Sequence, residues 1–258
     1  MVLEFGLIGD GHIAQKHRNA IKKVGGAIRF VYDPKYTKAD GFRFLSLSKR
    51  SEWIEFCRPL DYVVICSPTY LHREHLINVL KYAPNRTQVI VEKPMCLPWE
   101  PVIDDDRINV CLQLNWFPVP DFGKPKKIFV RMVRDEEYFK SWKGDPKLTG
   151  GIFYNLFIHY IVLAQKLKIP FVGIVSRHGK QIRTIEYHIN NGTFVDIDIN
   201  AVDMDILYSC MYYDILLGKG VKPKDLFYIH WLLERNSYLF GFGESVLNKE
   251  IIIDYDLY

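Results

Sequence analysis

A glycine-rich turn near the amino terminus, Gly9-Asp10-Gly11-His12-Ile13-Ala14, has the residue types needed to hold a pyrophosphate. The first glycine permits a tight turn, the second lets the backbone approach phosphate oxygens, and Ala14 lets a following helix lie close to a sheet. Backbone N–H groups at the helix start then face the phosphates. The turn therefore predicts a dinucleotide site formed by four residues: Gly9, Gly11, His12 and Ile13.

An acidic residue, Asp33, ends the second predicted strand, close to the spacing at which a carboxylate accepts ribose hydroxyls. Because a carboxylate repels a 2′-phosphate, Asp33 favours NAD over NADP. Lys35 and Arg29 lie nearby and weaken that preference. The alternative is a glycine turn without a ligand, in which Asp33 caps a loop.

A lysine follows another predicted strand in the segment Val91-Glu92-Lys93-Pro94. Ligands of open α/β sheets bind at the carboxyl ends of the strands, where Lys93 can reach a substrate hydroxyl and Pro94 holds the turn stiff. The alternative is an exposed lysine in a loop after the strand.

Asn155 and His159 lie four residues apart in the predicted helix Gly151–Leu167, so both side chains project from one face. An imidazole on this face can exchange a proton with a substrate. The alternative, for so apolar a helix, is a histidine that is satisfied within the protein core.

The elements that position these residues differ between the two halves of the chain. The first half alternates apolar runs with helical segments, which is typical of a parallel sheet. Its predicted strands are Leu3–Ile8, Ile28–Tyr32, Tyr62–Cys66, Val89–Val91 and Ile108–Leu114, and its helices are Ile13–Val24, Ser51–Cys57 and Arg73–Tyr82. The segment Pro34–Leu47 has room for a stunted helix and one short strand.

A boundary is predicted in Phe117–Lys127, where prolines, a glycine and lysines interrupt the pattern. Residues 1–118 then form a Rossmann domain, and residues 119–258 form a smaller α+β domain with a mainly antiparallel open sheet. Its predicted strands are Ile128–Val133, Phe171–Arg177, Gln181–Ile189 and Thr193–Ile199, with a hairpin turn at Asn191 and Gly192. Its predicted helices are Gly151–Leu167, Ile206–Leu217 and Lys224–Leu239.

The composition is that of a globular protein, because 48% of the residues are hydrophobic and 25% are charged. The net charge of +4 is small and spread along the chain, so we expect no nucleic-acid partner. No leader sequence is recognisable, and the apolar run Ile152–Leu163 is too short for a bilayer span, so no membrane is expected. Five cysteines without CxxC spacing indicate free thiols in the cytoplasm.

Four segments together resemble the glucose-fructose oxidoreductase, inositol dehydrogenase and MocA family. They are the GDGHIA turn, CSPTYLH (Cys66–His72), EKP (Glu92–Pro94) and GGIFYNLFIH (Gly150–His159), in the family's order along nearly the whole chain. Within the family, ICSPTYLHREH, LQLNWFP, SWKGD with TGGIFYN, and DILLGKG resemble UDP-N-acetylglucosaminuronate 3-dehydrogenases.

The resemblance implies an NAD-dependent enzyme that oxidises a sugar hydroxyl, with Lys93 and His159 catalytic and Asn155 where many relatives have Asp. It adds four residues to the expected cofactor site besides Lys93, namely Ser67, Pro68, His72 and Glu92. For the substrate site we expect Gln113, Asn115, Ser141, Lys143, Gly151, Asn155 and His159, with the start of the helix at Gly150-Gly151 facing an anion. No metal is expected.

Some residues depart from the family pattern: Phe157 stands where Gly is usual, Val162 where Asp is usual, and Asn115 where the sugar-acid enzymes have Arg. A free sugar or an inositol-type polyol is therefore an alternative substrate. A dinucleotide-sensing regulatory protein is the alternative outside enzymes. We expect a homo-oligomer through the second-domain sheet, because an exposed apolar sheet face needs a cover.

Overall fold

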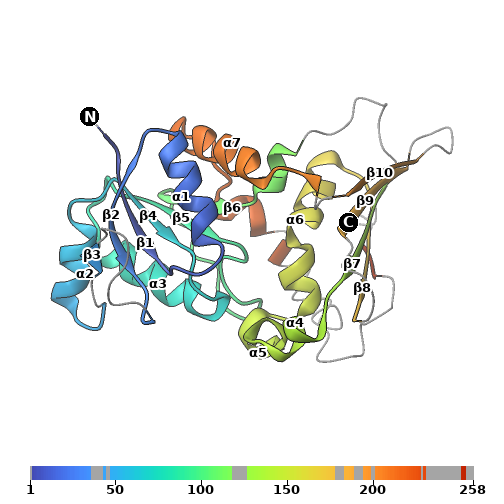
Figure 1. Cartoon of the computed structure of the whole chain (residues 1–258), viewed down its shortest axis with the longest axis horizontal. Helices are drawn as coiled ribbons and strands as arrows, with labels where there is room; N and C mark the ends of the chain where they lie inside the picture. Colours follow the sequence, from blue (N-terminus) through green and yellow to red (C-terminus); the bar gives the residue numbers. More distant parts are fainter. Residues whose placement is uncertain are drawn as a thin grey trace. The chain divides into compact units, whose positions relative to one another are not determined.

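The computed structural model describes residues 2–35, 43–44, 47–117, 127–177, 183–188, 194–198, 201–227, 229–230 and 251–253. Two compact units account for the chain (Figure 1). The first comprises residues 1–113 and 204–227, and the second comprises residues 114–203 and 228–258. Each unit is built on one sheet and is described separately.

The first unit contains a six-stranded parallel sheet with the order β3-β2-β1-β4-β5-β6. Its strands are β1 (Glu4–Ile8), β2 (Ala27–Tyr32), β3 (Arg43–Phe44), β4 (Tyr62–Ile65), β5 (Gln88–Glu92) and β6 (Ile108–Cys111). The order reverses between β1 and β4. In a doubly wound sheet, this reversal marks where a dinucleotide binds at the carboxyl edge.

Three helices connect these strands: α1 (Ala14–Lys23), α2 (Arg50–Cys57) and α3 (Thr69–Tyr82). The buried residues of α1, Ala14, His17, Ala20 and Ile21, recur at helical spacing and form a single face. The central strands are apolar and almost completely buried, as expected for a parallel sheet covered on both faces.

Helix α7 (Met204–Leu216) belongs to the first unit, where it packs against α1 (Figure 1). Gly218, with φ of 73°, follows its carboxyl end, as expected for a residue that must adopt a left-handed conformation. The chain thus returns to its first unit after the second sheet. The predicted division at residue 118 lacks this return, because periodicity identifies a helix but not its packing partner.

The second unit contains a five-stranded mixed sheet with the order β10-β9-β7-β8-β11. Its strands are β7 (Lys127–Val133), β8 (Phe171–Ser176), β9 (Arg183–His188), β10 (Phe194–Asp198) and β11 (Ile251–Ile253). All pairs are antiparallel except β7 with β8. Helix α6 (Ile152–Leu167) lies along β7 and β8 and connects them (Figure 1). Short helices α4 (Glu136–Lys140) and α5 (Pro146–Thr149) precede α6.

The predicted fold class is confirmed: a Rossmann sheet is accompanied by a mainly antiparallel second sheet. Two predicted bounds differ most from the structure: helix α3 begins at Thr69 rather than Arg73, and the strand predicted to reach Leu114 ends at Cys111, before the 3₁₀ turn η1 (Gln113–Trp116). Strand β11 was not predicted because it is only three residues long. The hairpin at Asn191 and Gly192, and most of the predicted helix Lys224–Leu239, lie outside the described residues.

The helical run Pro146–Leu167 has the length and hydropathy of a membrane span, although Ile152–Leu163 alone is shorter. In the most apolar part of this run, 88% is buried inside the protein. Such burial is typical of the core helix of a globular domain, which is hydrophobic on all sides.

Candidate active site

The glycine turn after β1 is held against β4 too closely for any side chain at its first position. Gly9 has φ of 102°, and a Cβ there would lie 2.7 Å from the Ser67 backbone nitrogen. A Cβ at Gly11, by contrast, would meet nothing within 4 Å. The protein therefore needs glycine at position 9 for its own packing, whereas the open space beside Gly11 is suited to a ligand.

Asp33 lies against this turn, as the sequence predicts. Its Oδ2 accepts the backbone N–H of Asp10 at 2.8 Å, and its Oδ1 accepts the N–H of Lys35 at 2.8 Å. Arg18 of α1 holds the turn from the other side, with its Nη2 2.7 Å from Asp10 Oδ1. Each Asp33 oxygen has capacity for another donor, so this carboxylate can accept ribose hydroxyls while it orders the turn.

Ser67 and Pro68, both predicted cofactor residues, lie directly after β4. The hydroxyl of Ser67 is 2.9 Å from Nδ1 of His75, and Pro68 is the residue before α3 begins. Burial lowers the pKa of His75 to about 4, with a smaller contribution from His72, so its ring is neutral near pH 7. His12 is exposed in the glycine turn, and Ile13 is partly buried before α1.

Glu92 lies inside the first unit rather than on its surface. Its Oε1 accepts the Tyr208 hydroxyl at 2.6 Å and lies 3.1 Å from Nε2 of His17, whose Nδ1 lies 2.8 Å from the Tyr212 hydroxyl. Burial raises the pKa of Glu92, but the bonds and charge from His17 and the Tyr208 bond outweigh it, so the pKa is lowered. An ionised carboxylate only accepts, so His17 donates from Nε2 and can accept from Tyr212.

No sequence motif marks this network. His17 is 0% exposed, so its imidazole is a buried member of the network. Its position on the buried face of α1 was a detectable signal, but its partners on α7 are far away in the sequence.

Three residues of this region could together ligate a metal ion, because the donor atoms of His17, Glu92 and Cys111 lie within 4.8 Å of one another. Burial raises the pKa of the Cys111 thiol well above its ordinary value, which disfavours the thiolate that binds metals.

Lys93 directly follows β5, as predicted, and its peptide bond to Pro94 is cis. Its backbone N–H lies 3.3 Å from Oε2 of Glu92. His72 is buried beside this turn: its Nδ1 lies 2.7 Å from the Pro94 carbonyl oxygen and its Nε2 lies 2.7 Å from the Ser67 carbonyl oxygen. The predicted cofactor residues from β1, β4 and β5 thus converge on one edge of the sheet.

In the second unit, Asn155 and His159 both lie on α6 and are 8% and 5% exposed. The Asn155 amide donates from Nδ2 to the hydroxyl of Tyr138 at 3.0 Å, which ties α6 to α4. Burial raises the pKa of Tyr138 to about 12, against the lowering effects of Asn155 and Arg134, so the phenol is neutral at ordinary pH. Tyr138 was not predicted because no motif marks it.

The other predicted substrate residues lie at the ends of short elements. Ser141 and Lys143 are exposed between α4 and α5, where Ser141 Oγ accepts the Lys143 N–H at 3.2 Å. Gly151 precedes α6 with φ of 98°. Gln113 is buried at the end of the first unit's segment, and Asn115 begins the second unit, with its carbonyl accepting Lys166 Nζ at 3.3 Å.

Phe157, the largest departure from the family pattern, is fully buried. Its ring meets that of Phe171 on β8 edge-on, with centroids 5.7 Å apart. The side chain of Phe157 therefore fills the core between α6 and its sheet. Val162, a second departure from the family pattern, is also buried, with 7% of its surface exposed.

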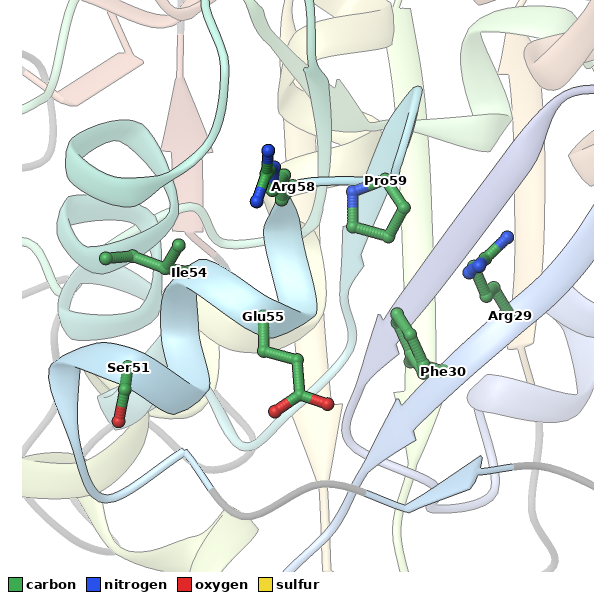
Figure 2. A pocket seen from close by; sticks show the side chains of 7 residues that line it. All are labelled: Arg29, Phe30, Ser51, Ile54, Glu55, Arg58 and Pro59. Carbon is green, nitrogen blue, oxygen red and sulfur yellow. The ribbon is translucent and has the colours of Figure 1, made fainter.

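A hollow of about 580 Å³ lies elsewhere in the first unit, beside β2 and α2. Figure 2 shows the side chains that line it: Arg29, Phe30, Ser51, Ile54, Glu55, Arg58 and Pro59. None of these residues belongs to the predicted cofactor or substrate sites, so this hollow plays no part in the chemistry discussed below.

The fold and the glycine turn together define a dinucleotide-binding Rossmann protein with a second α+β unit. Residues 3–104 match the Gfo/Idh/MocA family model, described as an oxidoreductase family with an NAD-binding Rossmann fold. Residues 3–104 therefore form the NAD-binding Rossmann domain that this family model describes.

Solved structures resemble the chain across both units. The WlbA (WbpB) dehydrogenase from Thermus thermophilus, in complex with NAD and UDP-GlcNAcA, is 21% identical with a TM-score of 0.70 over 94% of this chain and 96% of that chain. A myo-inositol dehydrogenase from Corynebacterium glutamicum is 14% identical with a TM-score of 0.64, covering 98% and 99%. The UDP-N-acetylglucosamine 3-dehydrogenase GnnA from Acidithiobacillus ferrooxidans is 12% identical with a TM-score of 0.61, covering 93% and 99%. At these identities, the similarity shows a shared fold.

Proposed function

We propose that this oxidoreductase oxidises a secondary hydroxyl of a sugar, specifically C3 of a UDP-linked N-acetylated sugar acid. The observation that carries the proposal is the convergence, at one sheet edge, of the open glycine turn, the Asp33 carboxylate and Lys93. Gly9, Gly11 and Asp33 would hold NAD there, which supplies a hydride acceptor. The remaining chemistry belongs to the side chains of this chain.

Lys93 and His159 have complementary roles in this proposal. His159 takes the proton from the substrate hydroxyl as the carbon–hydrogen bond breaks. Lys93 stabilises the negative charge that develops on the oxygen. Asn155, one helical turn before His159, orients the sugar. The alternative outside enzymes is a dinucleotide-sensing regulatory protein, which needs neither the lysine nor the histidine for ligand binding.

The nucleotide-sugar assignment draws on two kinds of support. Two structural relatives are a dehydrogenase solved with UDP-GlcNAcA and a UDP-N-acetylglucosamine 3-dehydrogenase. In this chain, Ser141, Lys143 and the start of α6 at Gly151 offer hydroxyl, ammonium and backbone groups suited to a pyrophosphate. Gln113 and Asn115 are proposed to contact the sugar.

A free polyol is the second candidate substrate, favoured by the myo-inositol dehydrogenase among the structural relatives. It is also favoured by Asn115, which lacks the charge to pair with a carboxylate or a phosphate. A thermal-shift panel that crosses NAD and NADP with UDP, UDP-sugars and free polyols separates the candidates, because ligands of the folded state raise its melting temperature. Stabilisation by UDP supports the nucleotide sugar, whereas stabilisation by inositol alone supports the polyol.

Turnover is tested by NADH formation with the substrate that this panel selects. We expect Lys93→Ala and His159→Ala each to lower kcat by about a hundredfold or more, while Lys81→Ala on the exposed side of α3 has no effect. The double variant should lose little beyond the worse single variant if both groups act in one chemical step. Near-native turnover by both single variants contradicts the mechanism, and no NADH formation with any sugar despite NAD binding supports the sensor.

We also propose a reducing compartment, the cytoplasm, because all five cysteines are free and four of them are buried. The second sheet is proposed to associate with that of another copy. Sedimentation of the purified protein tests the association, because a species larger than a monomer is expected. Repeating the measurement with and without reductant tests the free thiols, because no disulfide is expected to contribute to the assembly.

A further inference from the structure

His72 occupies an unusual position for a histidine, between two carbonyl oxygens. It lies in the first turn of α3 and is 1% exposed. Nδ1 is 2.7 Å from the Pro94 oxygen and Nε2 is 2.7 Å from the Ser67 oxygen. Both distances are at the short end of the range for nitrogen–oxygen hydrogen bonds. Both ring nitrogens therefore face carbonyl oxygens of the protein.

The two carbonyls belong to the turns after β4 and β5, which carry predicted cofactor residues and Lys93. Ser67 lies just after β4, against Gly9, while Pro94 directly follows Lys93 after β5. Strands β4 and β5 are neighbours, paired from Tyr62 with Gln88 to Ile65 with Val91. The His72 ring thus bridges the turn after β4, at Ser67, and the turn after β5, at Lys93 and Pro94, just beyond the last paired residues.

The protonation state of the His72 ring decides how many of its two contacts are hydrogen bonds. A carbonyl oxygen only accepts, and a neutral imidazole has one N–H, so one of the two contacts is a hydrogen bond in either tautomer and both are bonds in the charged ring. Burial lowers the pKa of His72, the Pro94 and Ser67 carbonyls raise it, Glu92 raises it and Lys93 lowers it, with a lowered pKa overall.

We propose that His72 is a positioning residue. It fixes the backbone of Lys93 through the Pro94 carbonyl, and it fixes the turn after β4, which lies against Gly9, through the Ser67 carbonyl. This rests on the proposed function, in which Lys93 acts on the substrate. The sequence prediction placed His72 among the cofactor contacts. Its geometry points instead to an indirect role, because neither ring nitrogen is left for the cofactor.

Two amide variants separate the two contacts. The asparagine amide in His72→Asn reaches the position of Nδ1 and places a donor against the Pro94 oxygen. The glutamine amide in His72→Gln reaches the position of Nε2 and places a donor against the Ser67 oxygen. Measurements are the Kd for NAD, kcat and KM for the sugar, and the thermal melt of each variant. Ile77→Ala, on the exposed side of the same helix, is the control.

We expect opposite patterns. His72→Asn keeps kcat near wild type but binds NAD more weakly. His72→Gln binds NAD normally but loses about 10- to 100-fold in kcat, the cost of a small misplacement of a catalytic group. A purely structural histidine would lower stability, NAD binding and kcat in the same way in both variants. Such a parallel loss overturns the proposal, as does near-native kcat and NAD binding in both.

Nitrogen NMR of the histidine rings in the wild-type protein provides a test that needs no stable variant. We expect the His72 ring to retain at least one slowly exchanging N–H. Two rapidly exchanging ring nitrogens overturn the bridge. If Lys93→Ala retains turnover, the proposed function fails instead, whatever the His72 variants do.

Discussion

The Glu92 carboxylate accepts the Tyr208 hydroxyl at 2.6 Å, although the two residues are 116 positions apart in the sequence. This bond joins the end of β5 to the middle of α7. It gives a physical reason for the return of α7 to the first unit, since a buried carboxylate without donors is costly. Because Glu92 directly precedes Lys93, the same network also orders the backbone from which the lysine extends.

Tyr208→Phe tests the strength of this bond. The variant leaves a buried carboxylate with one donor fewer, so we expect a loss of about 1.5–3 kcal/mol in the free energy of unfolding. Urea unfolding measures it. Tyr213→Phe, five residues later, is the matched control, because its hydroxyl bonds the Lys23 carbonyl at the surface. Equal effects of the two substitutions would show that burial of the carboxylate is not what matters.

Two glycines of one turn should respond differently to alanine. Gly11→Ala adds a methyl group into open space, so we expect an unchanged melting temperature but at least a tenfold increase in Kd for NAD, about 1.4 kcal/mol. Gly9→Ala drives the methyl group against the backbone at Ser67 and should lower both stability and NAD binding. Normal NAD affinity in Gly11→Ala would show that the cofactor does not approach this residue.

Acid should destabilise the protein through its buried histidines. Burial lowers the pKa of both His75 and His230 to about 4 from an ordinary 6.5. Between these two pH values, the unfolded chain binds more protons than the folded one, so stability is lost as the pH falls. The loss is about 3 kcal/mol at most for each histidine. Urea unfolding at several pH values measures it, and His75→Asn should flatten the curve.

The local parts of the candidate cofactor site could be predicted from the sequence. Gly9, Gly11 and Asp33 form a motif whose spacing follows from one strand, one turn and one helix, and Lys93 follows from the end of a strand. These predictions need only short-range geometry and the rule that parallel strands share a carboxyl edge.

The long-range parts could not be predicted. The buried network of His17 could not be predicted because its partners, Tyr208 and Tyr212, are on a helix that the sequence assigned to the other domain. The phenol of Tyr138 next to Asn155 follows from how α4 lies against α6, which periodicity does not specify. Phe157 departs from the family pattern, and the sequence does not specify that the side of α6 that it occupies faces the sheet.

Tyr138 provides the final test, because it holds the side chain of Asn155. Tyr138→Phe removes the acceptor 3.0 Å from Asn155 Nδ2, so the amide loses its fixed orientation. Since the pKa of Tyr138 is about 12, only its neutral hydrogen-bonding capacity is lost at ordinary pH. We expect KM for the sugar to rise while the Kd for NAD stays unchanged. If Tyr138 acts through Asn155, then adding Tyr138→Phe to Asn155→Ala has no further effect on KM. Additive losses in the double variant would mean that the phenol acts on the substrate independently of the amide.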